Sequence, residues 1–199
     1  MNHFKDCPID KDIVILASGE SIDDILKPDL NRIAKKHFVI AINFQDIIQP
    51  HARIWSDKNV TDWVETKDKD CIWITQPTAF HPKNSQKTLG DVDYWFDRRE
   101  EKFRTDYKWT LFWLLELIHK YFPKKKAYIF GMDCHNNVRK KYRGGEVISE
   151  KHIDNNCQEM PEAFRTMKNI RPKFLKNIYN MNLSSKVTSI QYENIKELY

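Results

Sequence analysis

Three side chains in the last third of the chain could transfer or orient protons. Asp133 follows an apolar run and the pair Gly131-Met132, and His135 and His152 come after it. Near neutral pH a histidine could take a proton from an acceptor hydroxyl group, and a carboxylate just past a strand could orient a substrate. Asp133, His135 and His152 are therefore candidate catalytic residues, with His152 preferred as the base. An ordinary surface histidine is the alternative for either imidazole.

A turn of small residues near the start of the chain could bind a nucleotide. The sequence A-S-G-E-S at residues 17–21 follows an apolar run at 13–16 and precedes a helical pattern. Small side chains let a phosphate or ribose approach the backbone, and a helix start offers unpaired N–H groups to an anion. Ser21 is the expected N-cap of that helix. The alternative is an ordinary strand–turn–helix corner, because the turn is neither a G-x-G-x-x-G fingerprint nor a Walker A loop.

Polar residues also follow other apolar runs, where predicted strands end. Asn43 follows the run at 37–42, Ser56 and Asp57 follow the run at 52–55, and Gly131 follows the run at 127–130. The carboxyl ends of parallel strands meet at one edge of a sheet, and ligands bind at that edge. The candidate nucleotide-binding residues are therefore Ala17, Ser18, Gly19, Ser21, Asn43, Ser56, Asp57 and Gly131.

Two irregular segments could face a substrate. Residues 76–104 contain prolines and an aromatic cluster, which indicates a lid or an inserted segment, and residues 134–152 form a polar, basic loop. Arg98, Arg99 and Lys108 could offset the charge of a leaving phosphate. A solvated helix face, on which Glu100 and Glu101 balance the arginines, explains the first of these segments equally well.

Composition limits the class of protein. The 199 residues predict one domain spanning 1–199, and the mean hydropathy of −0.68 with 31% charged residues predicts a soluble protein without a membrane span. The N-terminus lacks the apolar core of a signal peptide, so we expect a cytoplasmic location. Four widely spaced cysteines indicate reduced thiols, and no familiar metal-ligand spacing is present, so we expect no metal site. The net charge of +5 permits a nucleic-acid partner without requiring one.

The order of apolar runs predicts an α/β fold. Strands are expected at 13–16, 37–42, 52–55, 71–75 and 127–130, and helices at 22–36, 108–121 and 161–181. A last strand and turn are expected at 182–189 and a helical turn at 192–199. This order favours a single Rossmann-like domain, with a mostly parallel sheet and helices on both faces.

The motifs together resemble a known superfamily. They are I-L-A-S-G-E-S at 15–21, A-I-N at 41–43, Ser56-Asp57, I-F-G-M-D at 129–133 and N-L-S-S-K-V-T-S-I at 182–190. The set resembles the superfamily of bacterial CMP-sialic-acid-dependent sialyltransferases with a Rossmann-like fold. That superfamily also includes archaeal hydroxymethylpterin pyrophosphokinase-like (MptE-like) proteins and many small phage proteins. The similarity extends from residue 13 to residue 198.

The resemblance implies roles for individual residues. Gly19 and Ser21 match the family's phosphate- and ribose-binding G-x-G-P-S turn, while alanine replaces its first glycine and Glu20 its proline. The resemblance also implies that Asn43 contacts the nucleotide, that Asp133 is the aspartate of the G-x-D motif, and that His152 is near the position of the base.

The resemblance and the site residues together predict a nucleotide-dependent transferase, first of all a glycosyltransferase that moves a sugar from a nucleotide donor to a hydroxyl acceptor. Such an enzyme requires no separate cofactor, because the nucleotide-sugar is its substrate. The sequence defines neither the acceptor, for which modified phage DNA is one option, nor the oligomeric state. If a phage encodes the chain, the host cytoplasm is the expected location.

Two other functions are compatible with the same residues. One is a pyrophosphokinase of the MptE-like type, which would require Mg²⁺ and ATP and would use Asp57 and Asp133 as metal ligands. The other is a protein that binds or sequesters a nucleotide without turnover.

Overall fold

The computed structural model of the chain describes residues 2–57, 60–61, 63–64, 70–76, 92–103, 109–134 and 150–199, with the backbone alone at 150–157. The predicted catalytic residue His135 and the predicted phosphate partner Lys108 lie outside these residues. So do 77–91, within the predicted lid, and most of the predicted loop at 134–152. Within the described residues, no helix combines the length and the apolar composition that a membrane crossing requires.

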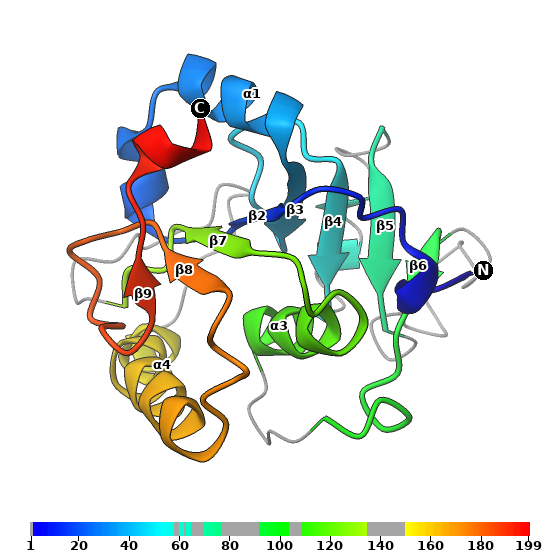
Figure 1. The fold of residues 1–199 in the computed structure, drawn as a ribbon. Coiled ribbons are helices and arrows are strands. Elements are labelled where there is room, and N and C mark those ends of the chain that lie inside the picture. Colours follow the sequence, from blue (N-terminus) through cyan, green and yellow to red (C-terminus); the bar gives the residue numbers. More distant parts are fainter. Residues whose placement is uncertain are drawn as a thin grey trace.

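The predicted α/β fold with a parallel sheet is confirmed (Figure 1). Nine strands pair in parallel in the order β1-β6-β5-β4-β3-β2-β7-β8-β9. They are β1 (Asn2–His3), β2 (Ile13–Leu16), β3 (Phe38–Ile42), β4 (Ala52–Trp55), β5 (Ile72–Thr75), β6 (Tyr94–Trp95), β7 (Ala127–Phe130), β8 (Ile178–Asn180) and β9 (Gln191–Tyr192).

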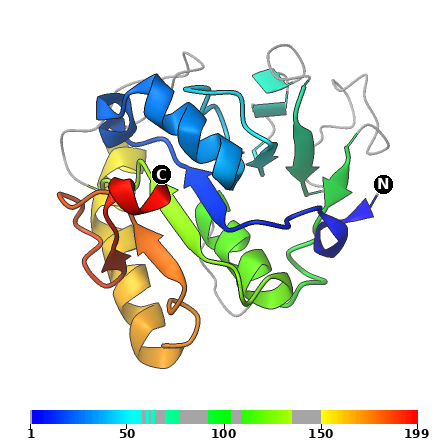
Figure 2. The ribbon, with the colours of Figure 1, turned by 45° about the horizontal axis from the view of Figure 1, so that its top comes forward.

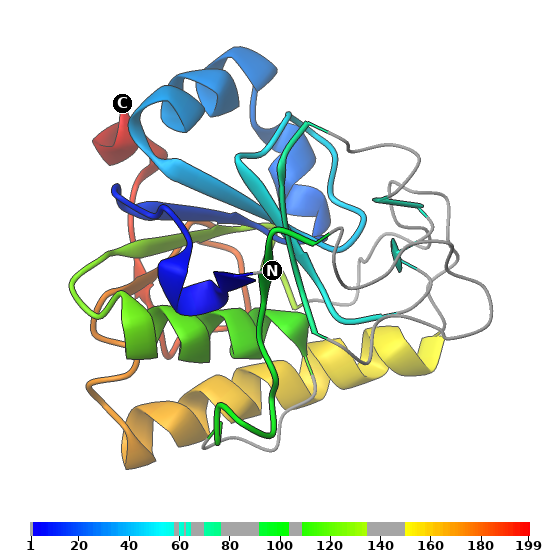
Figure 3. The ribbon, with the colours of Figure 1, turned by 90° about the vertical axis from the view of Figure 1, so that its right-hand side faces the viewer.

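Helices cover both faces of the sheet, as predicted (Figure 3). One face packs against α1 (Lys27–Lys36), and the other packs against α3 (Thr110–Tyr121) and α4 (Glu150–Ile170). In β2, Ile13 and Ile15 join the core beneath α3, while Val14 and Leu16 join the core beneath α1. Because both faces are covered, the strand is continuously apolar. Burial of each such side chain contributes about 1.5–3 kcal/mol.

The two ends of the chain close opposite parts of the fold (Figure 2). The N-terminal strand β1 pairs with β6 at one end of the sheet. The last turn, η5 (Ile195–Leu198), lies against α1, where Leu198 enters the core and Arg32 stacks over the ring of Tyr199. The C-terminal segment is therefore part of the core of this domain.

The direction in which the chain adds strands reverses between β2 and β7. After β2 the chain adds β3, β4 and β5 on one side, with β6 beyond them, and it then returns to place β7 on the other side of β2. The chain passes from β2 to α1 on one face of the sheet and from β7 to α4 on the other face. Open α/β sheets bind ligands at such a topological switch point. Candidate ligand-binding residues from both loops meet at this topological switch point.

The predicted helix at 22–36 is two separate elements. A 3-10 helix, η2 (Glu20–Asp24), is followed by extended backbone and then by α1. A continuous helix would need an N–H at residue 28 to bond the carbonyl of Asp24, but residue 28 is proline and has none. Proline is well tolerated in the first turn of α1, where no such bond is needed. The prediction of Ser21 as a helix N-cap was wrong, because Gly19 occupies that position in η2.

The bounds predicted for the helix at 161–181 were wrong, although residues 161–170 are helical. The helix α4 covers Glu150–Ile170, with Pro161 inside it, and β8 lies within the range assigned to the helix. Pro161 cannot donate to the carbonyl four residues earlier. Packing maintains the helix across this gap, since Met160, Phe164 and Met167 are buried at helical spacing in the core shared with α3. The strand predicted at 182–189 is replaced by turns, and β9 follows them.

The described part of the predicted lid belongs to the sheet. Within the segment 76–104, Tyr94–Trp95 forms β6, which pairs with β5 and β1. Phe96, directly after it, is fully buried against Trp113 of α3. Residues 92–103 thus form an edge of the core rather than a cover over a site.

Candidate functional site

Two glycines bring the loops after β2 and β7 into direct contact. The N–H of Gly19 donates to the carbonyl oxygen of Gly131 over 2.8 Å. A Cβ atom at residue 19 would lie 2.4 Å from that oxygen and 2.6 Å from Oδ2 of Asp133. Gly131 has φ of +72°, and a Cβ there would lie 2.7 Å from the carbonyl oxygen of Ala17. Contacts within the chain therefore require glycine both at residue 19, in the predicted nucleotide turn, and at residue 131.

Asp133 is the centre of a buried hydrogen-bond network. Only 5% of the residue is exposed. Its carboxylate accepts the backbone N–H of Ser21 over 2.8 Å, the hydroxyl group of Ser21, and the side-chain amide of Asn182 over 2.8 Å. Hydrogen bonds to an ionised acceptor are about twice as strong as neutral ones. The network, here called the Asp133 network, joins three segments that are distant in the sequence.

This network changes the expected role of the turn at residues 17–21. The N–H of Ser21 is bonded to a carboxylate of the chain itself, and the N–H of Gly19 is bonded to a carbonyl. The prediction that these N–H groups are free to bind an anion was therefore wrong. A phosphate at Ser21 would have to displace Asp133, and the two anions would repel each other.

The segment 182–187 forms hydrogen bonds to Met132 and Asp133 that hold the network in place. The Oδ1 atom of Asn182 accepts the N–H of Ser184, which orients the amide toward Asp133. The hydroxyl group of Ser185 donates to the carbonyl oxygen of Met132 over 2.6 Å, and the N–H of Lys186 donates to the carbonyl oxygen of Asp133 over 3.1 Å. The motif N-L-S-S-K carried these residues in the sequence, but its pattern did not reveal their partners.

The loop after β3 lies beside the same turn. The side-chain amide of Gln45 donates to the carbonyl oxygen of Ala17 over 2.7 Å. The side chain of Arg53, from β4, donates to the carbonyl oxygens of Asn43 and Gln45 and stacks over the ring of Trp63. Arg53 is only 1% exposed, so this cation is part of the core beneath the loop. Gln45 and Arg53 were not recognised as site residues in the sequence.

Asn43 presents an unsatisfied acceptor at this edge. Its backbone has φ of +52°, in the left-handed region, and its N–H donates to the carbonyl oxygen of Ile54. Its Oδ1 atom is buried and has no hydrogen-bond partner among the described residues. A buried polar atom without a partner is uncommon and costs about 1–3 kcal/mol. Asn43 therefore lies next to the turn, as predicted, with a buried acceptor that no described residue satisfies.

Other predicted residues are distributed along the same edge or away from it. Ser56 shares a hydrogen bond with the hydroxyl group of Thr110, and Asp57 is exposed just beyond it. Arg98 and Arg99 do not join the Asp133 network. They follow β6, four strands from β2 and thus about 19 Å away at the usual strand spacing. Arg98 instead stacks over Trp113 of α3.

Of the three predicted catalytic residues, only Asp133 has a described side chain. His152 lies in the first turn of α4, whose side chains are described from residue 158 onward. Cys134 is buried, with φ of +53°, and its Sγ atom lies 3.5 Å from Sδ of Met160. In the described ranges, no group of three or more His, Cys, Asp or Glu residues could hold a metal ion.

The comparisons with known proteins found no similarity that assigns the site. No protein-family model, no curated protein and no solved structure matches the chain. The interpretation of the site therefore rests on its geometry and on the resemblance of its short motifs.

Proposed function

We propose that the protein is a nucleotide-dependent transferase that binds its nucleotide at the carboxyl edge of the sheet, beside the loops that follow β2, β3 and β7. The observation that carries this proposal is the topological switch point, because open α/β sheets bind ligands in the crevice at that point. A glycosyltransferase that moves a sugar from a nucleotide donor to a hydroxyl acceptor is the favoured activity, on the resemblance of the motifs.

Asn43 supports a ligand with hydrogen-bond donors. A ribose has hydroxyl donors and several bases have exocyclic amines, and either group would satisfy the buried Oδ1 atom. Because Arg53 and Gln45 hold the loop from beneath, the acceptor is already in place before a ligand arrives. Such preorganisation lowers the free-energy cost of binding.

In this proposal Asp133 positions the site without contacting the substrate. Its two oxygens already accept three hydrogen bonds, and they hold Ser21 and Asn182 in fixed positions. His152 is the proposed base. It would take the proton of the acceptor hydroxyl as that oxygen bonds to the sugar carbon, while the bond from this carbon to the phosphate oxygen breaks and the nucleotide leaves.

The bonding of Asp133 favours this proposal over the kinase alternative. A pyrophosphokinase would use Asp57 and Asp133 to hold Mg²⁺, which prefers carboxylate oxygens and water in octahedral geometry. A metal at Asp133 would have to displace Ser21 or Asn182 from a buried network. The metal-independent transferase needs no such rearrangement.

A thermal-shift screen against CMP, CDP, UDP, GDP, ADP and ATP, each with and without Mg²⁺, tests the proposal. A nucleotide at about 100 times its dissociation constant stabilises the native state by about 2.7 kcal/mol, which raises Tm by roughly 5–11 °C. A metal-independent response supports the transferase. A response to ATP only with Mg²⁺ would replace it by the kinase, and no response to any nucleotide would refute nucleotide binding.

The variant Asn43→Gly locates the response. Glycine keeps the left-handed backbone and the carbonyl that Arg53 binds, but it removes the unpartnered oxygen. The thermal shift should therefore fall while the free protein remains stable. Lys102→Gly is the matched control, because Lys102 also has φ of +52° and lies in the turn beyond β6. It should keep the full response to nucleotide.

Turnover separates the transferase from a sequestering protein. The variant His152→Ala should keep the thermal shift with nucleotide but lose transfer or hydrolysis of the nucleotide-sugar that binds. Unchanged turnover in this variant would exclude His152 as the base. A wild-type protein that binds the nucleotide but never turns over its nucleotide-sugar would support the sequestering function.

A further inference from the structure

Two neighbouring clefts lie at the opposite, amino-terminal edge of the sheet. The larger, of about 850 Å³, lies between the C-terminal ends of α3 and α4 and the turn at 101–103. The smaller, of about 300 Å³, lies between α3, the turn before β7 and the segment before β8. His119, Lys173 and Phe174 line both clefts, so the two are adjacent. Figure 1 views the molecule from this edge, with the ends of α3 and α4 toward the reader. We call this surface the amino-edge groove.

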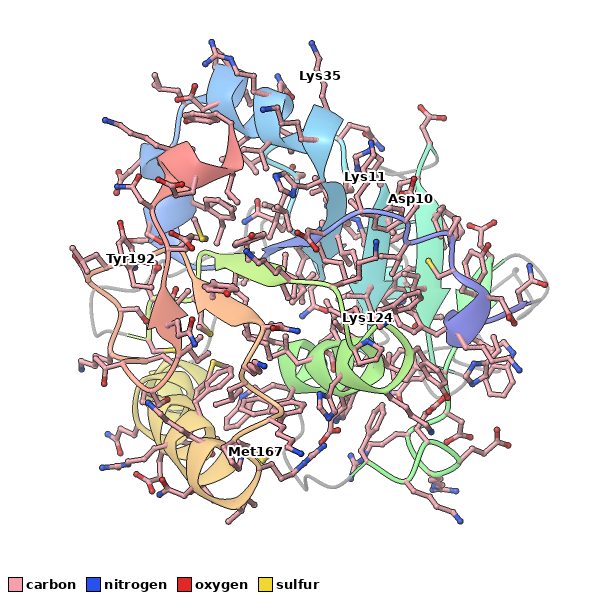
Figure 4. The ribbon with its side chains drawn as sticks, in the orientation of Figure 1. Asp10, Lys11, Lys35, Lys124, Met167 and Tyr192 are labelled. Atoms are coloured by element: carbon pink, nitrogen blue, oxygen red, sulfur yellow. The ribbon has the colours of Figure 1, made fainter. Side chains whose placement is uncertain are left out.

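The amino-edge groove contains most of the excess positive charge of the chain. Its acidic residues are Glu101 and Glu116, and its cationic residues are Lys102, Lys120, Lys125, Arg171, Lys173 and Lys176. This is a surplus of four positive charges at one place, in a chain whose net charge is +5. Lys124, labelled in Figure 4 at the end of α3, extends the positive surface beyond the lining.

Both acidic residues are neutralised by cations of the groove. Glu116 accepts two hydrogen bonds from the guanidinium group of Arg171, and Glu101 is paired with Lys120. Lys125 donates to a backbone carbonyl, that of Asp10, so its charge is not compensated by this bond. Lys173 and Lys176 are exposed and form no ion pair within the described part of the chain. The lysines therefore face solvent with their charge available to an anion.

Aromatic and apolar surface alternates with these cations. Phe103, His119 and Phe122 are half-buried in the groove walls, and Ile170 at the end of α4 is 64% exposed. Cationic side chains that follow a phosphate backbone, together with rings on which bases stack, are the features that bind single-stranded nucleic acid. A duplex has its bases paired and stacked inside, so it could use the lysines but not the apolar clefts.

We infer that the amino-edge groove binds single-stranded nucleic acid, with lysines on the phosphates and unstacked bases in the apolar clefts. The groove lies at the amino ends of β7 and β8, whereas Asn43 and the Asp133 network lie at the carboxyl ends of the strands. The inference is therefore independent of the proposed transferase activity. A strand held here would bind at a site separate from the nucleotide.

Fluorescence anisotropy of a labelled 15-nucleotide oligothymidine, titrated with the 199-residue protein, tests this inference. Lys102, Lys125, Lys173 and Lys176 provide four phosphate contacts, so log K should fall with log salt with a slope of about −3. Affinity should then decrease roughly fifty-fold between 50 and 200 mM salt. A duplex of the same length should bind more weakly. No binding at 50 mM salt, or tighter binding of the duplex, would overturn the inference.

A pair of charge-matched variants locates the binding. The double variant Lys173→Glu, Lys176→Glu should weaken binding at least about tenfold at 50 mM salt and reduce the salt slope to about −1.4. The control Lys27→Glu, Lys196→Glu changes the net charge equally at two exposed lysines at the start of α1 and in η5. It should retain the slope. Equal losses in both double variants would mean that net charge, and not the groove, attracts the strand. The response to mononucleotides should be unchanged in both.

Discussion

The contact between the two glycine loops predicts that Gly19→Ala is severely destabilising. Gly19 has φ of −69°, which alanine adopts freely, so the effect is purely steric. The new Cβ would lie 2.4 Å from a backbone oxygen, and ordinary contact requires the loops to separate by about 1 Å. Overpacking costs about 1–3 kcal/mol, and weakening of the hydrogen bond from Gly19 to Gly131 adds about 0.5–1.5 kcal/mol. We expect a loss of about 2–4 kcal/mol.

Urea unfolding followed by tryptophan fluorescence measures this loss, which corresponds to a decrease in Tm of roughly 4–16 °C. Ser18→Ala is the control, because Ser18 is the preceding residue of the same turn and is only half-buried. Its stability should remain within about 0.5 kcal/mol of the wild type. A Gly19→Ala protein as stable as Ser18→Ala would refute the view that the two loops meet in a close, rigid contact.

Three further predictions concern buried polar groups. Asp133→Asn should reduce the free energy of unfolding by about 1–3 kcal/mol in urea, because an amide nitrogen must then face the N–H of Ser21 or the amide of Asn182. Adding Ser21→Ala should cost less in that background than in the wild type, and additive losses would contradict a shared network. Burial lowers the pKa of His51 below its usual 6.5, and its Nδ1 atom accepts the N–H of Val39, so the neutral form is favoured in the native state. Stability from this residue should be present above pH 6.5 and lost as the pH falls below it, and His51→Asn should lack that loss in unfolding measurements from about pH 7 to 5. Burial, with the nearby Asp93 carboxylate, raises the pKa of Cys7 to about 12, so a thiol reagent at about pH 8 should label Cys7 only as fast as the protein unfolds. Rapid labelling of Cys7 in the native protein, identified by mass spectrometry, would contradict this.

The central strands could be predicted from the sequence because their environment is uniform. Residues 13–16, 52–55 and 127–130 form β2, β4 and β7 with the predicted bounds. Each of these strands is buried along its whole length, between helices or beside them. A strand covered in this way is continuously apolar and ends where polar residues begin, so its limits are visible in the sequence.

Elements that depend on distant contacts could not be predicted in this way. The strands β1 and β6 have two residues each, too few to show a period, and pairing with their neighbours defines them. The helix α4 passes through Pro161 because packing against α3 outweighs a local preference. Local sequence patterns define a strand that is covered along its whole length. Short strands at a sheet edge and a helix that contains a proline depend instead on contacts in the completed fold.

The edge that holds the candidate site was predicted, but its bonding was not. Placing Ser21, Asn43 and Asp133 at the carboxyl ends of strands followed from the apolar runs alone. The bond from Ser21 to Asp133 joins residues 112 positions apart, and no local signal reveals it. The same carboxylate occupies the N–H that a phosphate was expected to use. Gly19 and Gly131 are likewise explained by their mutual contact and not by a bound ligand.

The proposed nucleotide site lies at the carboxyl edge of the sheet, beside the loops that follow β2, β3 and β7. Amide hydrogen exchange, measured by mass spectrometry with and without the nucleotide that raises Tm most, tests the position of this site. The proposed position predicts slower exchange at residues 17–21, 43–45 and 131–134, and unchanged exchange in the amino-edge groove at 119–126 and 170–177. Protection confined to the groove, or absent from all three loops at saturating nucleotide, would contradict it.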